Sequence, residues 1–179
     1  MSNIYYPTCN LVIADPTCSP CPPKELGRVR AVAFVLNSYT FVDITSPTEW
    51  ADAYCNKNVF IFPFTQGDVS WTPNKENGFG NQKEELVSYD ITVKFMLPDV
   101  QNTWDFLNQI KKTYNYRLVW KTETLIYQSA VPVTASPTLP IADDIKSRVK
   151  WNVECTMTQE DLPQPITAPA GIFDQCIGC

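Results

Sequence analysis

Two stretches of this chain alternate between apolar and polar side chains, and this alternation decides what the chain can fold into. The stretches are residues 86–97 and 145–158. Their apolar positions are Val87, Tyr89, Ile91, Val93, Phe95 and Leu97 in the first, and Ile145, Val149, Trp151, Val153, Cys155 and Met157 in the second. A period of two places these side chains on one face of an extended strand. Each strand therefore needs a sheet with one buried face and one polar or partnered face.

Shorter apolar runs predict further strands around these two. They are residues 28–36, 39–43, 58–64, 116–121 and 125–129. Asn37-Ser38 would be a two-residue turn between the first two runs, and residues 122–124 would join the last two as a hairpin. Pro63 has no N–H to donate, so it should interrupt the pairing of its strand.

A short helix is predicted to begin at Ser46 and to end near Cys55. Ser46 can cap the helix, Pro47 occupies the first helical position, and Glu49 completes a capping box. Its expected buried face is Trp50, Ala53 and Tyr54.

A longer helix is predicted over residues 103–114. Its apolar residues are Trp104, Leu107, Ile110 and Tyr114. Their spacing places them on one side of a helix, as for a helix that packs on a core.

Prolines divide the chain into a central domain and two arms. The sequence has 15 prolines, several of them in residues 1–27 and 159–179, where they disfavour helix and central strand. We therefore expect extended N- and C-terminal arms around a β-rich domain at residues 28–158. Residues 65–85 and 132–144 would be long loops. The predicted fold is mainly β, a β-sandwich or open barrel, with one main helix and a short helix.

The composition excludes several classes of function. The 179 residues include no histidine, which removes Ser-His-Asp and Cys-His catalysis. The net charge of −5 argues against a groove that holds nucleic acid by its phosphates. The first residues have neither the basic nor the apolar region expected of a secretory signal, and no run reaches the roughly 18 apolar residues of a membrane helix. We therefore expect a protein without enzymatic activity and without a membrane span.

Cysteine pairs near the two ends point to a metal site. Each pair has the Cys-x-x-Cys spacing, and two such pairs can supply the four sulfurs of a tetrahedral zinc ion. The predicted zinc ligands are Cys18, Cys21, Cys176 and Cys179. Free thiols, disulfides or a local clamp that includes Cys9 are the alternatives. They stay open because residues 22–175 separate the pairs, whereas compact zinc ribbons use about 15–20 residues.

The remaining cysteines and three tryptophans lie on predicted apolar faces. Cys55 and Cys155 are expected to pack in the core as small hydrophobic side chains. The same position on periodic apolar faces assigns Trp104, Trp120 and Trp151 to the core rather than to an aromatic platform for nucleic acid.

Other candidate motifs have ordinary interpretations. Adjacent carboxylates are typical of solvated loops rather than of catalytic pairs, which need two distinct environments. These pairs are Glu84-Glu85, Asp143-Asp144 and Glu160-Asp161. Gly78-Phe79-Gly80 lacks the remaining parts of a nucleotide-binding motif and is expected to act as a loop hinge. Lys146, Arg148 and Lys150 form a basic ladder, expected to be a solvated face or to pair with an acidic neighbour across an assembly interface.

The order of elements resembles that of a family of virion proteins. The residues that carry the resemblance are the strand 86–97, the helix 103–114, the strand 145–158, the loop 65–85 and the two arms. They are similar to the tube-forming proteins of tailed-phage tails and the related ring proteins at the head–tail junction, and the first strand region resembles structural proteins from phages of gut Bacteroidetes. The resemblance implies a sandwich or barrel whose hairpin loop and arms reach adjacent subunits. It also implies a ring, commonly of six copies, around a DNA channel.

These observations favour a structural function. The first hypothesis is a virion protein that assembles into a ring or tube with other virion proteins, around DNA that passes without specific binding. The alternative is a zinc-stapled module that decorates a capsid or acts as an adaptor. An enzyme with a site built from the loops 65–85 and 132–144 is the least favoured, because histidine is missing.

Overall fold

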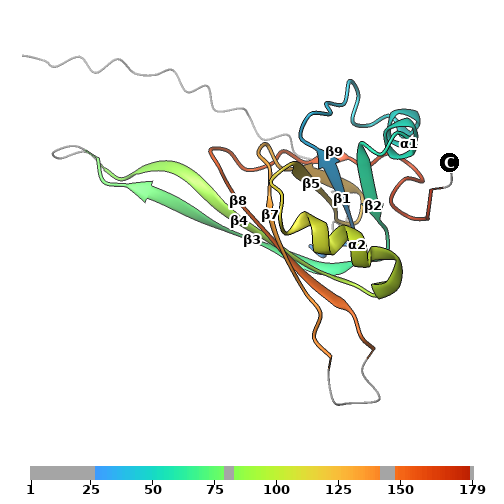
Figure 1. Ribbon diagram of the computed structural model, residues 1–179. Coiled ribbons are helices and arrows are strands. Elements are labelled where there is room, and N and C mark those ends of the chain that lie inside the picture. Colours follow the sequence, from blue (N-terminus) through green and yellow to red (C-terminus); the bar gives the residue numbers. More distant parts are fainter. Residues whose placement is uncertain (1–26, 79–82, 142–147, 178–179) are drawn as a thin grey trace, which may run out of the picture.

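The structure is a computed structural model that describes residues 27–78, 83–141 and 148–177. It confirms the predicted fold class, since two antiparallel sheets pack face to face as an open β-sandwich with two helices (Figure 1). One sheet has five strands in the order β2-β1-β5-β6-β9, and the other has four in the order β3-β4-β8-β7. The elements are β1 (Ala31–Leu36), α1 (Pro47–Cys55), β2 (Val59–Phe62), β3 (Gln66–Glu76), β4 (Glu85–Leu97), α2 (Val100–Ile110), β5 (Tyr116–Lys121), β6 (Leu125–Gln128), β7 (Thr134–Thr138), β8 (Trp151–Gln159) and β9 (Ile166–Thr167).

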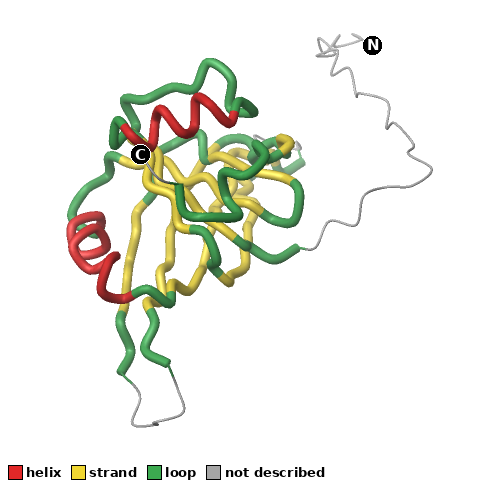
Figure 2. Tube along the Cα trace, turned by 90° about the vertical axis from the view of Figure 1, so that its right-hand side faces the viewer, coloured by secondary structure: helices red, strands yellow, loops and turns green. Residues whose placement is uncertain are grey.

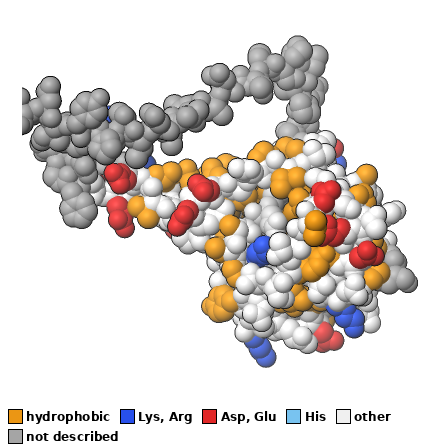
Figure 3. Space-filling view, turned by 90° about the horizontal axis from the view of Figure 1, so that it is seen from above, with side chains coloured by type: hydrophobic (Ala, Val, Ile, Leu, Met, Phe, Trp, Pro, Cys, Tyr) orange, Lys and Arg blue, Asp and Glu red, His pale blue; other side chains and the backbone are white. Residues whose placement is uncertain are grey.

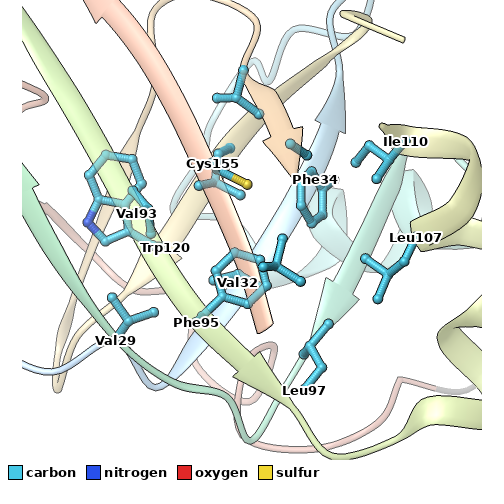
Figure 4. Close-up of a cluster of buried hydrophobic side chains, with 14 of the residues drawn as sticks. Val29, Val32, Phe34, Val93, Phe95, Leu97, Leu107, Ile110, Trp120 and Cys155 are labelled. Carbon is cyan, nitrogen blue, oxygen red and sulfur yellow. The ribbon is translucent and has the colours of Figure 1, made fainter. Parts of the chain in front are cut away.

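The main core lies between the two sheets, and Figure 4 shows its central side chains. The inward side chains of β4 from Ile91 to Leu97 and those of β8 are buried, as their alternation predicts. Phe34 of β1 is fully buried at the centre, with its ring centroid 5.4 Å from that of Phe106 and 6.3 Å from that of Phe95. Such tilted and edge-on ring pairs add to the stabilisation from buried apolar area.

A second core covers the other face of the five-stranded sheet. The side chains of β1 are buried on both of its faces, which explains why Ala31–Leu36 is a continuous apolar run instead of an alternating one. The ring of Trp50, from α1, packs 5.0 Å from that of Phe173 near the C-terminus. Figure 2 shows α1 and the neighbouring loops lying against this side of the strands. The five-stranded sheet is thus covered on both faces.

The two sheets are joined at Gly67. Val29 and Gly67 exchange backbone hydrogen bonds, with N···O distances of 3.0 and 3.2 Å. A Cβ atom at position 67 would lie 2.0 Å from the carbonyl oxygen of Lys94. The chain can therefore step from one sheet to the other here only because this residue has no side chain.

The helix α1 begins as predicted, but its first turn also organises the loop before it. The Ser46 hydroxyl accepts a hydrogen bond from the Glu49 N–H at 3.4 Å. The Glu49 carboxylate does not close the box on Ser46. It accepts from the backbone N–H groups of Val42 and Asp43 at 2.7 and 2.8 Å. The predicted strand at residues 39–43 is therefore wrong, because this stretch is a loop held by Glu49.

Two segments predicted as loops contain strands of the four-stranded sheet. Residues 66–76, within the predicted loop 65–85, form β3 and pair with β4 along its length. Residues 134–138, within the predicted loop 132–144, form β7 and pair with β8. Both are edge strands with exposed polar side chains and a proline, so they lack the apolar pattern by which strands are recognised.

The main helix is shifted relative to its prediction. It begins at Val100, with the Asp99 side chain accepting from the Asn102 N–H, and it ends at Ile110. Leu107 and Ile110 are buried, but Trp104 is half exposed. The predicted core position of Trp104 is therefore wrong, whereas Trp120 and Trp151 are buried as expected.

The C-terminal segment is extended but lies along its own domain. β9 pairs with β6, and Ile172 and Phe173 enter the second core. The Lys121 ammonium, which is largely buried, donates to the Asp174 carboxylate at 2.6 Å. Residues 159–177 therefore complete the domain instead of leaving it as a free arm. The predicted N-terminal arm falls on residues outside the described part of the chain, apart from Gly27.

Candidate functional site

The described chain leaves the outer face of the four-stranded sheet uncovered. Paired positions on neighbouring strands point to the same side of a sheet, so the register gives this face row by row. The rows are Gln66, Met96, Asn152 and Thr138; Asp68, Lys94, Glu154 and Ser136; Ser70, Thr92, Thr156 and Thr134; and Thr72, Asp90 and Thr158. Hydroxyl and amide side chains dominate these rows. The face is therefore suited to contact with water or with a polar partner.

The charged groups on this face are mainly acidic. Lys94 pairs with Glu154 at 3.6 Å, which leaves Asp68 and Asp90 as the remaining charges in the rows. The Thr158 hydroxyl donates to Asp90 at 2.6 Å, and this bond and a second one from Asn74 lower the pKa of Asp90. Asp90 therefore stays ionised well into the acidic range. A shallow hollow of about 420 Å³ lies over the row that contains Lys94 and Glu154.

Both edges of this sheet are open within the described residues. β3 and β7 stand at the two ends of the strand order, so each pairs with only one other strand there, and the outer edge of β3 is occupied only at Gly67, by Val29. An edge strand presents unpaired backbone N–H and C=O groups, to which another chain can add. Pro73 in β3 and Pro137 in β7 have no backbone N–H, so each edge lacks a hydrogen-bond donor at one position. β3, with 11 residues, is the longer edge.

The hairpin of β3 and β4 carries an exposed apolar surface. Figure 1 shows that the two strands continue beyond the five-stranded sheet. Trp71 pairs with the buried Ile91, so it lies on the core face of the sheet, yet 55% of it is exposed. Leu86 and Val87, near the start of β4, are 48% and 45% exposed. Figure 3 shows hydrophobic and acidic side chains together along this projecting part. We call Trp71, Leu86 and Val87 the hairpin surface.

A second exposed apolar surface lies at the opposite end of β4. Trp104 on α2 stacks obliquely on Trp151, with the ring centroids 5.4 Å apart, and is 48% exposed. Val149, two residues before Trp151, is also exposed. The Nε1 donor of Trp151 is buried and has no acceptor among the described residues. We call Trp104, Trp151 and Val149 the helix surface.

The predicted zinc ligands fall mostly outside the described residues. Cys18, Cys21 and Cys179 lie there, and Cys176 is exposed with a free thiol. Within the described ranges, no cluster of three or more cysteine, aspartate or glutamate side chains could hold a metal ion. The zinc site stays a prediction.

The two other cysteines differ from each other. Cys155 is buried with a free thiol as expected, and burial raises its pKa, so it is unreactive. Cys55 was expected in the core, but it is exposed at the end of α1 and disulfide-bonded. The helix ends there, with Asn56 as its C-cap, so the side chain leaves the buried face that Trp50 and Ala53 define.

The remaining sequence candidates lie on the surface. Glu84-Glu85 and Glu160-Asp161 are exposed, and Lys75 pairs with Glu84 at 3.7 Å. Asp143-Asp144 and Lys146 fall outside the described residues. Arg148 and Lys150 are exposed and precede β8 instead of lying in it. In the described part of the chain, no helix has the length and apolar character needed to cross a membrane.

Sequence reasoning missed the hairpin surface and misplaced Trp104. The short alternation of Val69, Ser70 and Trp71 was the available signal for β3, but Gly67 and Pro73 on either side obscured it. For Trp104, the true buried face of α2 includes Thr103, Leu107 and Ile110, so the apolar stripe is displaced by one position.

Comparison with known proteins gives no relative. No family model, no curated protein and no solved structure matches this chain.

Proposed function

We propose that this chain is a structural protein that assembles with copies of itself into a ring or tube, of the kind found in phage tails or at the head–tail junction. In such an assembly the four-stranded sheets of neighbouring copies would stand side by side around a channel. The observation that carries the proposal is the four-stranded sheet itself, which combines two open edges with an uncovered polar face. The resemblance in element order points the same way, as does the sandwich fold.

The open edges supply a means of lateral contact. An edge strand of one copy can pair with the opposite edge of the next, which satisfies backbone groups on both. Because β3 and β7 are different edges of one sheet, such a contact is heterologous, and heterologous contacts close into rings when the rotation between copies allows it.

The polar face supplies the chemistry of a channel wall. Its hydroxyl and amide groups hold water, and Asp68 and Asp90 carry negative charge. Fixed negative charge repels the phosphates of a nucleic acid, so a polyanion can pass without being held. A wall of this kind needs no catalytic group. In this proposal the assembly forms in the host cytoplasm and becomes part of the virion.

Light scattering of the native chain over a wide range of concentrations tests this function. The expected result is a mass that rises with concentration to a defined oligomer or to tubes, with rings or tubes visible by negative-stain electron microscopy. A chain that stays monomeric at the highest concentration contradicts the proposal. The zinc content of the same sample tests the predicted cysteine site independently.

A further inference from the structure

We infer that a pocket at the junction of the two sheets binds a single carboxylate carried by an apolar group. This inference goes beyond the proposed function and does not depend on assembly. The pocket has a volume of about 420 Å³, which lies within the range of small-molecule sites. Three segments line it: Arg28 and Arg30 before β1, residues 64–66 between β2 and β3, and Phe173 with Asp174 near the C-terminus.

Backbone hydrogen bonds hold two of these segments together. The Thr65 N–H donates to the Arg30 carbonyl at 2.8 Å, and the Arg30 N–H donates to the Lys121 carbonyl at 2.8 Å. Beside them, Val29 and Gly67 exchange the two bonds that join the sheets. The spacing between Arg30 and Thr65 is therefore fixed by the fold, so the site is formed before a ligand arrives.

Two buried polar groups of the lining lack a partner among the described residues. They are the hydroxyl of Thr65 and the Nε of Arg30. Thr65 is only 5% exposed, so water does not replace the missing partner at its surface. A buried donor without an acceptor is unfavourable, and native proteins leave few of them. Both groups can donate, so a ligand that accepts hydrogen bonds would satisfy them.

The charges around the pocket leave one cation without a counterion. Arg30 forms an ion pair with Glu123, and Lys121 forms one with Asp174 at 2.6 Å. Arg28 is exposed and makes no ion pair within the described part of the chain. The two pairs are neutral, so Arg28 gives the group an excess of one positive charge. A carboxylate neutralises this excess and accepts the available hydrogen bonds, whereas a phosphate dianion would exceed it.

Phe64 makes the ligand more than a bare anion. Its backbone has a φ of 63°, in the left-handed region that a bulky side chain rarely adopts. Phe64 is nevertheless 66% exposed, so its own packing does little to offset the strain. Strained residues of this kind cluster at ligand sites. An apolar group beside the carboxylate would cover the ring and offset that strain.

Titration of the full-length chain with 3-phenylpropanoate, followed by calorimetry or NMR, tests the inference. We expect saturable binding in the millimolar range, and at least about tenfold weaker binding of the neutral 3-phenylpropanamide. Inorganic phosphate should also bind more weakly than the acid. Arg28→Gln should weaken binding of the acid about tenfold, because it removes a charge-assisted contact without disturbing a buried group. Arg148→Gln, at an exposed arginine outside the pocket, is the matched control and should bind like the wild type.

Four results would overturn the inference. They are a wild type that shows no saturation, equal affinity for acid and amide, phosphate binding as tight as that of the acid, and unchanged affinity in Arg28→Gln.

Two further variants separate binding from stability. Thr65→Val keeps the shape of the side chain and removes the unpartnered hydroxyl, so it should weaken binding several-fold without lowering the melting temperature. A lower melting temperature would show that the hydroxyl already has a partner within the chain. Phe64→Asn keeps a residue that tolerates a positive φ and removes the ring. It should weaken binding of 3-phenylpropanoate but leave that of acetate unchanged, and equal effects on both would refute the apolar contact.

A tripeptide distinguishes the two sources of such a carboxylate, a free organic acid and the C-terminal end of a peptide. Glycyl-glycyl-phenylalanine presents the same ring and carboxylate at a chain end. If it binds more tightly than 3-phenylpropanoate, and its C-terminal amide does not bind, the site takes a chain end. If the free acid binds more tightly, the site takes a small organic acid.

Discussion

The two ends of β4 have the same alternating pattern and opposite surroundings. At the C-terminal end, Phe95 is 2% exposed beneath the five-stranded sheet, whereas Val87 at the N-terminal end is 45% exposed. The alternation assigns both side chains correctly to the same face. It does not say how far the opposing sheet extends, because that depends on the lengths of β1, β2 and β5. The difference separates the part of β4 that is covered within one chain from the part that the described chain leaves uncovered.

The first prediction uses this contrast directly. Phe95→Ala should lower the free energy of unfolding by about 3–5 kcal/mol, because it removes a ring from a packed core and leaves a cavity. Leu86→Ala on the same strand should change it by less than about 0.5 kcal/mol, because that side chain is half exposed. Urea unfolding of dilute protein measures both. Equal losses would show that the hairpin end is already buried within the monomer.

A second prediction concerns the cover on the five-stranded sheet, which comes from the chain itself. Asp174→Asn should lower the free energy of unfolding by about 1–2 kcal/mol, because it leaves the Lys121 ammonium largely buried without its partner. The loss stays small because the Asp174 side chain is 66% exposed, so solvent screens the ion pair. Thermal unfolding of Asp174→Asn and of Asp161→Asn as a surface control provides the comparison. An unchanged melting temperature would contradict the role of the C-terminal segment as an anchored cover.

The third prediction concerns the uncovered face of the four-stranded sheet. Thr92→Lys with Thr156→Lys adds positive charge to adjacent positions of this face. Stability should change by no more than about 0.5 kcal/mol, since both positions are at the surface. Assemblies of this variant should retain DNA in a salt-dependent manner, whereas wild-type assemblies should not. Co-sedimentation with DNA fragments measures this. Equal DNA binding by both proteins would argue against this face as the wall of a channel.

The smallest predicted effect is a change in the pKa of one side chain, that of Asp90. Thr158→Val removes the hydroxyl that donates to Asp90, so the pKa of Asp90 should rise toward its ordinary value. A carboxyl with a lowered pKa stabilises the fold above its unfolded pKa, near 4, and that contribution is lost as the pH falls through the folded value. The variant should therefore lose less stability than the wild type on acidification. NMR titration of Asp90 measures the shift, and an unchanged pKa would refute the assigned hydrogen bond.

The sequence predicts those parts of the molecule that depend on contacts between residues close in the chain, and the strand faces that are buried. The core faces of β4 and β8, the cap at Ser46 and the hairpin of β5 and β6 all follow from residues close in sequence. The edge strands β3 and β7 could not be recognised, because their many exposed polar side chains and their prolines interrupt the apolar alternation. The loop at residues 39–43 has strand-forming residues, but Glu49 binds the backbone groups that a strand would pair.

The candidate surfaces were less accessible to prediction than the fold. Trp71 could be placed on the core face only once β3 was known to pair with β4, and its exposure depends on where the other sheet ends. The stacking of Trp104 on Trp151 joins α2 to the start of β8, far away in the sequence. Only the basic character of Arg148 and Lys150 was evident from the sequence.

The most direct test is hydrogen exchange of the amides of β4 in dilute and in concentrated wild-type protein. We expect the amides from Ile91 to Leu97 to be strongly protected at both concentrations, because they belong to the core of a single chain. We expect the amides near Leu86 and Val87, and those of β3 around Trp71, to gain protection only in the concentrated sample, where a second copy would cover them. Protection of the hairpin that is equal at both concentrations would contradict the claim that this end of the molecule is completed by a partner.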